Sequence, residues 1–361
     1  MTRLPTLLVA LLASAWLVAA APARAAVPKD FFGVVSEDVL AGDSAYRNAT
    51  LNEQASAGVG LIRQTFHWKD IETRPGVYDF TQYDAYMAAT ASHGIKVLPI
   101  LFDPPSFRAR TGARGTYPPT KYATIGAFGA AIARRYGPNG SFWAQHPELP
   151  KLPVTAYQVW NEPNLRAYWP TGQSPKAYAK LLKAAAAGIR AVDPRAEIVT
   201  AGLPDSKLSK PLDVYGYVRA LLAAHAASSF TTLALNPYSK NKRDLFAKLS
   251  RFRSILNAAH DGKAQIWITE LGWSDSGPAS LFRAGASGQA KQITSVFPAL
   301  AAARAKLRLR GVVYYAWRDG APYAPLFKDF WGLHTGLLNL SGGGKPAFQA
   351  FQKTVKQLEL H

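Results

Sequence analysis

Two glutamates occupy matching places at the ends of two apolar segments, and their chemistry gives the first indication of function. Glu162 follows the segment 155–160 within Trp-Asn-Glu-Pro-Asn, and Glu270 follows the segment 265–269 within Ile-Thr-Glu-Leu-Gly. Hydrolysis of a glycosidic bond needs one carboxylic acid to protonate the leaving oxygen and one carboxylate to attack the sugar carbon or to activate water. The pair therefore predicts a glycosidase site. The plain alternative is a strand-end glutamate that forms only a salt bridge or faces solvent.

The elements that must position these glutamates alternate between strand-like and helix-like patterns, which is the order of βα units around a parallel sheet. The eight segments expected to form strands are 31–35, 61–65, 96–101, 155–160, 197–201, 232–235, 265–269 and 311–316. The plainest helical segments are 122–136, 175–192, 212–224, 244–259, 288–307 and 346–358. The pattern predicts an α/β fold, a single-domain (β/α)8 TIM barrel, which commonly takes about 250 residues.

In such a barrel the loops at the C-terminal ends of the strands form the active site. Glu162 follows the fourth expected strand and Glu270 follows the seventh. Closure of the ring is therefore expected to bring both carboxyl groups to one cleft, although they lie far apart in the sequence.

The sequence resembles the clan A glycoside hydrolases, retaining (β/α)8 enzymes whose acid/base follows an asparagine on strand four and whose nucleophile ends strand seven. The resemblance covers nearly the whole chain after residue 25. It rests on Asn161-Glu162-Pro163, Thr269-Glu270, Arg63, the run from His67 to Glu72, the segment 75–80, Tyr238 and Trp317. Within the clan the chain is most similar to family 39, with family 5 as the alternative. It departs from the pattern at Asn236, where many relatives carry histidine.

The resemblance implies a role for each matching residue. Glu162 is expected to be the general acid and then the base, and Glu270 the nucleophile of a double displacement. Asn161 is expected to donate to the sugar 2-hydroxyl, while Arg63 and Tyr238 keep Glu270 ionised. The side chains expected to offer flat faces to sugar rings are Trp317, Trp68, Trp169 and Trp273. Ordinary packing is the alternative for Tyr238 and Trp317, and a core ion pair is the alternative for Arg63.

The first 25 residues have the pattern of a signal peptide. Arg3 precedes the apolar stretch 7–21, and Ala-Arg-Ala at 23–25 has the small-x-small form of a cleavage site. We expect a catalytic domain of residues 26–361 that is secreted, whether extracellular, periplasmic or associated with the cell wall. An uncleaved anchor is the alternative, but the stretch is shorter than the roughly 20 residues that span a bilayer. No later segment has a transmembrane pattern, so no integral membrane contact is expected.

The composition excludes several kinds of site. The chain has no cysteine, which excludes disulfides and thiolate chemistry, and its seven histidines include no pair four residues apart. We therefore expect no metal and no cofactor. The formal charge is +19, or +17 without residues 1–25, which favours anionic partners. No nucleic-acid-binding motif is present, so the expected partner is a carbohydrate, with an anionic polysaccharide and a merely solubilising charge both left open.

Basic residues gather in two of the expected C-terminal loops. They are Arg108, Arg110 and Arg114 after the third strand, and Lys240, Lys242 and Arg243 after the sixth. They are candidates for contacts to an anionic substrate, and a solvated rim is the alternative.

The expected activity is that of a secreted retaining glycosidase, either a β-glycosidase or an endoglycosidase, that hydrolyses O-glycosidic bonds of a poly- or oligosaccharide. Two alternatives stay open: a transglycosylase on the same scaffold, and a carbohydrate-binding pseudoenzyme without turnover. The sequence does not determine the sugar, the linkage, endo or exo action, or the oligomeric state.

Overall fold

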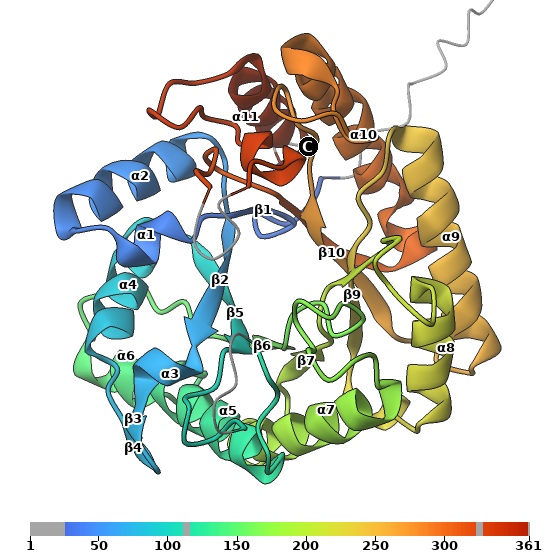
Figure 1. The fold of residues 1–361 in the computed structure, drawn as a ribbon. Helices are drawn as coiled ribbons and strands as arrows, with labels where there is room; N and C mark the ends of the chain where they lie inside the picture. Colours follow the sequence, from blue (N-terminus) through green and yellow to red (C-terminus); the bar gives the residue numbers. More distant parts are fainter. Residues whose placement is uncertain (1–25, 111–115, 323–327, 360–361) are drawn as a thin grey trace, which may run out of the picture.

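The computed structural model describes residues 26–110, 116–322 and 328–359, which form a closed parallel barrel surrounded by helices (Figure 1). The eight barrel strands are β1 (Phe32–Val35), β2 (Leu61–His67), β5 (Lys96–Phe102), β6 (Ala156–Val159), β7 (Glu197–Val199), β9 (Thr232–Asn236), β10 (Gln265–Leu271) and β11 (Leu309–Tyr314). Neighbours in the ring follow chain order, and β11 pairs with β1 to close it. The predicted single-domain TIM barrel is confirmed.

The helices lie outside the ring of strands (Figure 1). They are α1 (Asp38–Ala41), α2 (Ser44–Ser56), α3 (Trp68–Ile71), α4 (Thr81–Ser92), α5 (Ala123–Tyr136), α6 (Ser141–Gln145), α7 (Pro175–Arg190), α8 (Val214–Ala223), α9 (Lys242–Ala258), α10 (Gly285–Leu307) and α11 (Pro346–Glu359). The six predicted helices are all present, with ends that differ by at most three residues. The remaining short elements are the hairpin of β3 (Glu72–Arg74) and β4 (Val77–Tyr78), β8 (Leu203–Pro204), which pairs with β9, and the 3-10 helices η1 (Ala227–Ser229) and η2 (Trp331–His334).

Local sequence signals explain how the helix after β6 begins and packs. Ser174 accepts a hydrogen bond from the Ala177 amide, and Pro175 occupies the first turn of α7, as expected for an N-cap followed by proline. A Cβ on Gly188 would lie 2.0 Å from the Gly126 carbonyl oxygen of α5. Glycine at this position therefore allows α5 and α7 to approach at backbone distance.

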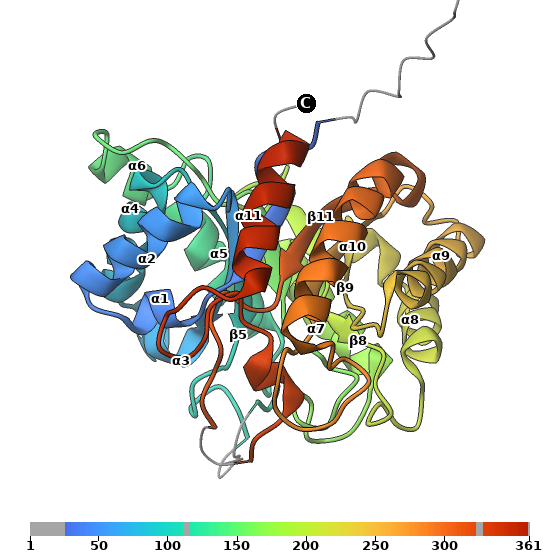
Figure 2. The same cartoon turned by 90° about the horizontal axis from the view of Figure 1, so that it is seen from above.

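The interior of the barrel is a layer of side chains to which each strand contributes one. Its members are Val35, Leu61, Leu98, Ala156, Val199, Ala234, Trp267 and Val313, all buried. This layer is the floor beneath the polar residues at the C-terminal ends of the strands. At the opposite end of the barrel, the Val27 amide donates to the Leu358 carbonyl (Figure 2). The two ends of the described chain therefore meet away from the face that is formed by the C-terminal ends of the strands.

Within the described residues, no helix combines the length and the apolar character needed to cross a membrane. The predicted signal peptide, residues 1–25, lies outside the part that the structure describes.

Candidate active site

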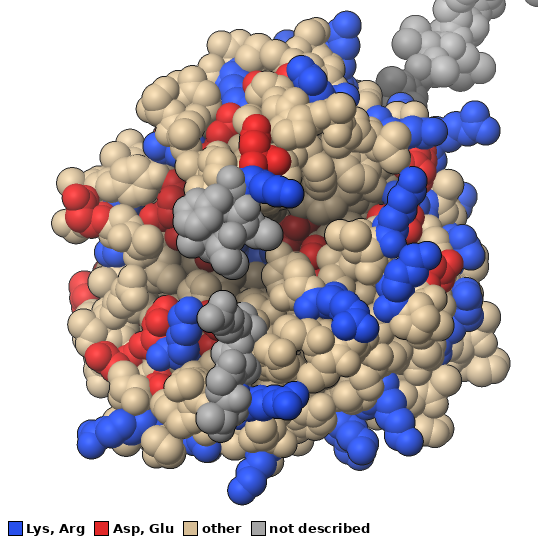
Figure 3. All heavy atoms as spheres, in the orientation of Figure 1, with Lys and Arg blue, Asp and Glu red and all other residues tan. Residues whose placement is uncertain are grey.

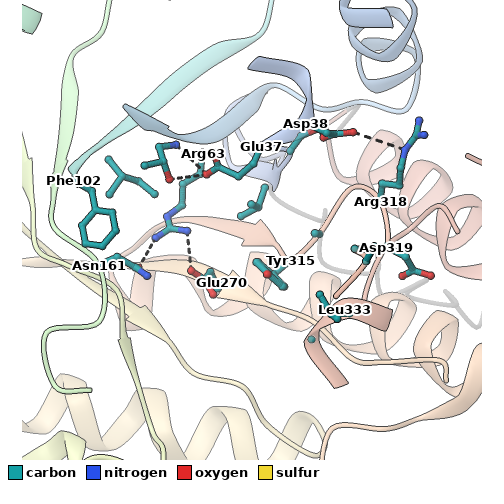
Figure 4. A pocket seen from close by; sticks show the side chains of 18 of the residues that line it. Glu37, Asp38, Arg63, Phe102, Asn161, Glu270, Tyr315, Arg318, Asp319 and Leu333 are labelled. Atoms are coloured by element: carbon teal, nitrogen blue, oxygen red, sulfur yellow. Dashed lines mark hydrogen bonds and ion pairs between the residues drawn. The ribbon is translucent and has the colours of Figure 1, made fainter. Parts of the chain in front are cut away.

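Arg63 connects the two glutamate motifs above the apolar floor of the barrel (Figure 4). Its side chain projects from β2 and is almost fully buried, at 2% exposure. Nη1 donates to Glu270 Oε1 at 2.8 Å, Nη2 donates to Asn161 Oδ1 at 3.0 Å, and Nε donates to Gln158 Oε1 at 2.7 Å. One guanidinium thus fixes the nucleophile candidate on β10 against the residue that precedes Glu162.

Glu270 has donors on both of its carboxylate oxygens. Arg63 occupies Oε1, and the Tyr238 hydroxyl donates to Oε2 at 2.7 Å. Burial, followed by the negative charge of Glu270, raises the pKa of Tyr238 well above its ordinary value, so this phenol keeps the proton that it donates. A cation and a charge-assisted hydrogen bond together stabilise the carboxylate form of Glu270. The contacts predicted for Arg63 and Tyr238 are present, and their role in turnover stays a prediction.

Glu162 lies in a different environment. It is buried at 8% exposure, and its Oε1 accepts one hydrogen bond, from Asn236 Nδ2 at 2.8 Å. The Thr269 hydroxyl donates to Asn236 Oδ1 at 2.8 Å, which fixes the amide so that its NH2 group faces Glu162. Burial and the negative charge of Glu270 raise the pKa of Glu162 to about 8, and the Asn236 hydrogen bond opposes part of this shift. A carboxyl group with this pKa holds a proton at neutral pH.

The backbone at the end of β6 contributes to this arrangement. Trp160 and Glu162 both have positive φ angles, of 75° and 43°, and the Glu162 amide donates to the Gly202 carbonyl at 3.1 Å. Non-glycine residues rarely adopt this left-handed conformation, and such strain is typical of functional sites. The strained turn places the Glu162 carboxyl beside Asn236.

Asn161 is placed to use its amide as a donor. Its Oδ1 accepts from Arg63, which orients the amide and leaves its NH2 group to donate, and the side chain borders the cavity that contains Glu270. This arrangement is compatible with the predicted contact to a sugar hydroxyl.

The tryptophans predicted to stack on sugar rings are all in the core, so this part of the prediction is wrong. Trp68, Trp273 and Trp317 are 0% exposed, and Trp169 is 1% exposed. Trp68 stacks on Phe128 of α5 and donates to Glu72, and Trp273 donates to the Ser239 carbonyl. None of these indole faces is accessible to a ligand.

A cavity of about 670 Å³ opens beside Glu270 at the centre of the face (Figure 3). Its phenylalanine and tyrosine lining comes from Tyr46 on α2, Phe102 at the end of β5, Tyr168 after β6 and Tyr315 after β11. Phe102 is held edge-on against Trp160, with ring centroids 4.8 Å apart. The volume is in the range of small-molecule sites, about 300–1,000 Å³. The aromatic rings that reach this cavity therefore come from phenylalanine and tyrosine, and none of the predicted tryptophans borders it.

Several polar residues of the site were not identified from the sequence. Gln158 orients Arg63. It is a polar residue within the apolar strand β6, and this contrast could have marked it in the sequence as a candidate site residue. Glu37 follows β1 and borders the cavity, and it carries the same strand-end signal as Glu162. His67, by contrast, belongs to the run on which the family resemblance rests, with a substrate contact and a structural role both left open. It borders the cavity, with Nδ1 3.1 Å from Asp103 Oδ2. Burial opposes protonation of His67, but the Asp103 hydrogen bond and the charge of Glu37 outweigh it and raise the pKa of the imidazole.

The basic residues of the two loops have different surroundings in the structure. Arg108 forms an ion pair with Glu72, which lies outside the cavity lining, while Arg110 is exposed and Arg114 lies outside the described residues. Lys240 borders a second cavity, of about 540 Å³, together with Lys207, Lys210 and Lys248. Figure 3 shows acidic atoms within and around the central hollow and many basic side chains on the side of α7 to α9. Charge is therefore distributed unequally around the face.

Across the described ranges, no group of three or more His, Asp or Glu side chains is arranged to hold a metal ion.

The sequence matches no protein-family model and no curated protein sequence. The structure, however, is similar to that of a family 39 glycoside hydrolase from Bacteroides cellulosilyticus, with a TM-score of 0.65 and 18% identity over 92% of this chain and 64% of that one. It is also similar to a family 39 β-xylosidase from Caulobacter crescentus (TM-score 0.66, 22% identity, 91% and 72% covered) and to a family 39 enzyme from Xanthomonas axonopodis (0.66, 20%, 91% and 66%).

The chain shares its fold with family 39 glycoside hydrolases. It spans between 64% and 72% of the length of these three relatives. At these identities the similarity establishes the barrel, and the chemistry has to be argued from the site itself.

Proposed function

We propose that this protein is a retaining glycoside hydrolase that cleaves an O-glycosidic bond of an oligo- or polysaccharide by double displacement. The observation that carries the proposal is the contrast between two neighbouring glutamates. Glu162 has a pKa of about 8, and Glu270 is held by Arg63 and Tyr238. Two carboxyl groups whose environments favour opposite protonation states supply an acid and a nucleophile at the same pH.

In the first step, Glu162 gives its proton to the glycosidic oxygen while Glu270 attacks the anomeric carbon. The bond from that carbon to the leaving oxygen breaks, the leaving group departs as an alcohol, and an ester bond forms to Glu270. The Asn161 amide donates to the neighbouring sugar hydroxyl as positive charge develops on the ring. Arg63 fixes the attacking carboxylate and the Asn161 side chain in one geometry.

In the second step, ionised Glu162 removes a proton from water, which attacks the anomeric carbon and displaces Glu270. The product keeps the anomeric configuration of the substrate because the carbon has been inverted twice. The structure supplies a reason for the change of role. Repulsion from Glu270 is part of what raises the pKa of Glu162, and esterification removes that charge. The pKa of Glu162 then falls, and the acid of the first step becomes the base of the second.

The substrate and location belong to the same proposal. The Caulobacter relative is described as a β-xylosidase, so a β-xyloside is the first substrate to test. Export through the predicted signal peptide of residues 1–25 would bring the enzyme to extracellular or cell-wall polysaccharide. An anionic polysaccharide stays a prediction for the outer part of the face, where lysines border the second cavity.

The test is chemical rescue with azide, using dinitrophenyl β-glycosides of xylose, glucose, galactose and mannose. These leaving groups need little acid assistance, so Glu162→Ala should still form the glycosyl-enzyme and then release it to azide as the β-glycosyl azide. In Glu270→Gly, azide should instead take the place of the missing nucleophile and give the α-glycosyl azide. Opposite product configurations in the two variants would assign both roles.

Glu148→Gln is the matched control, because it removes one exposed carboxylate from the segment that precedes β6. It should turn over like the unaltered protein. The proposal would be overturned by wild-type turnover that inverts the anomer, or by turnover that persists in Glu270→Gly without azide.

A further inference from the structure

The cavity beside Glu270 carries an excess of negative charge among its described residues. Its lining includes the acidic residues Glu37, Asp38, Glu270 and Asp319 and the basic residues Arg63 and Arg318, besides His67. Resting on the function proposed above, we infer that this cavity binds a neutral sugar residue, that Glu37 accepts a hydrogen bond from one of its hydroxyls, and that Glu37 excludes uronates.

Three of the four carboxylates are already compensated. Glu270 is paired with Arg63 at 2.8 Å, and Asp319 is paired with Lys345 at 2.7 Å. Asp38 lies 3.8 Å from the Nε of Arg318. Lys345 also pairs with Asp275, so it compensates Asp319 only in part, but each of these three carboxylates has a cation beside it.

Glu37 is the fourth carboxylate. The groups that donate hydrogen bonds to it are neutral, although its charge also acts on the imidazole of His67 across the cavity lining. Its Oε1 accepts from the Thr65 amide at 3.0 Å and from the Thr65 hydroxyl at 2.7 Å, and its Oε2 accepts from the Gln64 amide. In the part of the chain that the structure describes, it forms no ion pair within 4.0 Å. These donors hold the carboxylate in place without neutralising it.

This anchoring leaves Glu37 able to accept from a ligand. A carboxylate offers about four lone-pair sites, and its three neutral donors occupy fewer than that. The residue is exposed and borders the same cavity as Glu270 (Figure 4). A sugar hydroxyl can donate to it, whereas a uronate carboxylate brings a second negative charge and no donor.

Of the two arginines of the cavity, Arg63 has its donors occupied and Arg318 is paired with Asp38. Arg63 uses Nε, Nη1 and Nη2 on protein acceptors. Arg318 is oriented by Asp38 and lies against the ring of Tyr46, with 5.3 Å between the guanidinium carbon and the ring centroid. A uronate would have to compete with Asp38 for Arg318 while facing Glu37.

The remaining walls also suit a neutral sugar. Ile100, Phe102 and Leu333 supply apolar surface, against which the C–H faces of a sugar ring can pack. The other cavity is bordered by four lysines and three aspartates, so its lining has a small excess of positive charge that the cavity beside Glu270 lacks.

Paired substrates that differ only at C6, where a carboxylate replaces a hydroxymethyl group, test this inference. The probes are aryl β-glucoside against aryl β-glucuronide, and aryl β-galactoside against aryl β-galacturonide. The wild type should favour the neutral member in kcat/KM by about 10²-fold, since a facing like charge costs several kcal/mol. Glu37→Gln keeps the shape and removes the charge, so the preference should fall at least tenfold, roughly the effect of 1.4 kcal/mol. Glu148→Gln has the same charge change away from the cavity and should leave the preference unaltered.

A second measurement separates failure of the selectivity from failure of the proposed hydrolysis. Phenyl thio-β-glycosides of the same four sugars resist hydrolysis, and their binding can be followed by calorimetry. If nothing is hydrolysed but a neutral thioglycoside binds in a Glu37-dependent manner, the inference stands and the hydrolase proposal fails. If turnover occurs and Glu37→Gln, folded by thermal melting, keeps the wild-type preference, the inference is wrong while the hydrolase proposal survives. Absence of both turnover and thioglycoside binding would overturn both.

Discussion

Glu162 and Glu270 lie at the C-terminal ends of two strands of one barrel, yet their surroundings are opposite in electrostatic character. Glu270 accepts a hydrogen bond from a guanidinium on one carboxylate oxygen and from a phenolic hydroxyl on the other. Glu162 meets a neutral amide and the negative charge of Glu270, and it is buried. The comparison shows that identical side chains at equivalent strand ends acquire different chemistry from the residues on neighbouring strands.

The difference depends on where the charge partners project. Arg63 comes from β2 and reaches Glu270, while it contacts the Glu162 motif only through Asn161. A single cation therefore stabilises one carboxylate much more than the other. Single substitutions of the residues around the two glutamates, or of Glu162 itself, can each remove one part of this asymmetry.

Loss of Arg63 should have the largest effect. Arg63→Met leaves Glu270 buried without its cation, which should lower the free energy of unfolding by about 3–5 kcal/mol and reduce turnover strongly. Urea unfolding and steady-state kinetics measure the two effects. In a Glu270→Gln background the cost should shrink, because no carboxylate remains to be paired. Equal costs in both backgrounds would mean that Arg63 serves the core and not Glu270.

Substitution of Glu162 should stabilise the protein at the expense of activity. Its pKa is about 8 when folded, against 4.5 for the ordinary carboxyl, so the folded state loses stability as pH rises between these values. Glu162→Gln should therefore unfold less readily than the wild type by about 1 kcal/mol or more near pH 8, with little difference near pH 5. Unfolding curves over this range provide the measurement. A difference that does not grow with pH would contradict the assigned pKa.

Removal of the Tyr238 hydroxyl should have a smaller effect. Tyr238→Phe keeps the ring packing and deletes the 2.7 Å hydrogen bond to Glu270. A hydrogen bond to a charged group contributes about 1.5–3 kcal/mol, so kcat/KM should fall by roughly 10- to 100-fold. Unaltered kinetics would assign Tyr238 to packing, which was the alternative drawn from the sequence.

Substitution of Asn236 should have the smallest effect, which is a shift in the pH dependence of activity. Its hydrogen bond lowers the pKa of Glu162, so Asn236→Leu should raise that pKa further. Activity requires protonated Glu162 and should then persist to higher pH, by up to about one pH unit on the basic limb. A limb that moves to lower pH would contradict the geometry in which Asn236 donates to Glu162.

The sequence was sufficient to predict most of the barrel and the centre of the site. Parallel strands buried on both faces appear as continuous apolar runs, and all eight were located. Closure of the ring then places strand ends together, which explains why Arg63, Asn161, Tyr238 and the two glutamates could be grouped. Helix α2 was not predicted because its buried face includes Arg47, Thr50 and Gln54, which break an apolar stripe.

Burial of the tryptophans could not be read from the sequence because it depends on contacts between distant elements. Trp68 follows β2, and the helix that covers it is α5, whose Phe128 stacks on its indole at 5.0 Å. Glu37 was overlooked for a different reason. Its strand-end position was visible, but its neutral partners on β2 are a property of the assembled barrel.

The most direct test of the central contrast is a ¹³C NMR titration of the Glu162 carboxyl carbon, assigned with Glu162→Gln and repeated in Glu270→Gln. It needs no knowledge of the substrate sugar. We expect a midpoint near pH 8 in the wild type, and a lower one in Glu270→Gln because a repelling charge has been removed. A wild-type midpoint near the ordinary 4.5, or one that Glu270→Gln leaves unmoved, would contradict the assignment of Glu162 as an acid controlled by its partner.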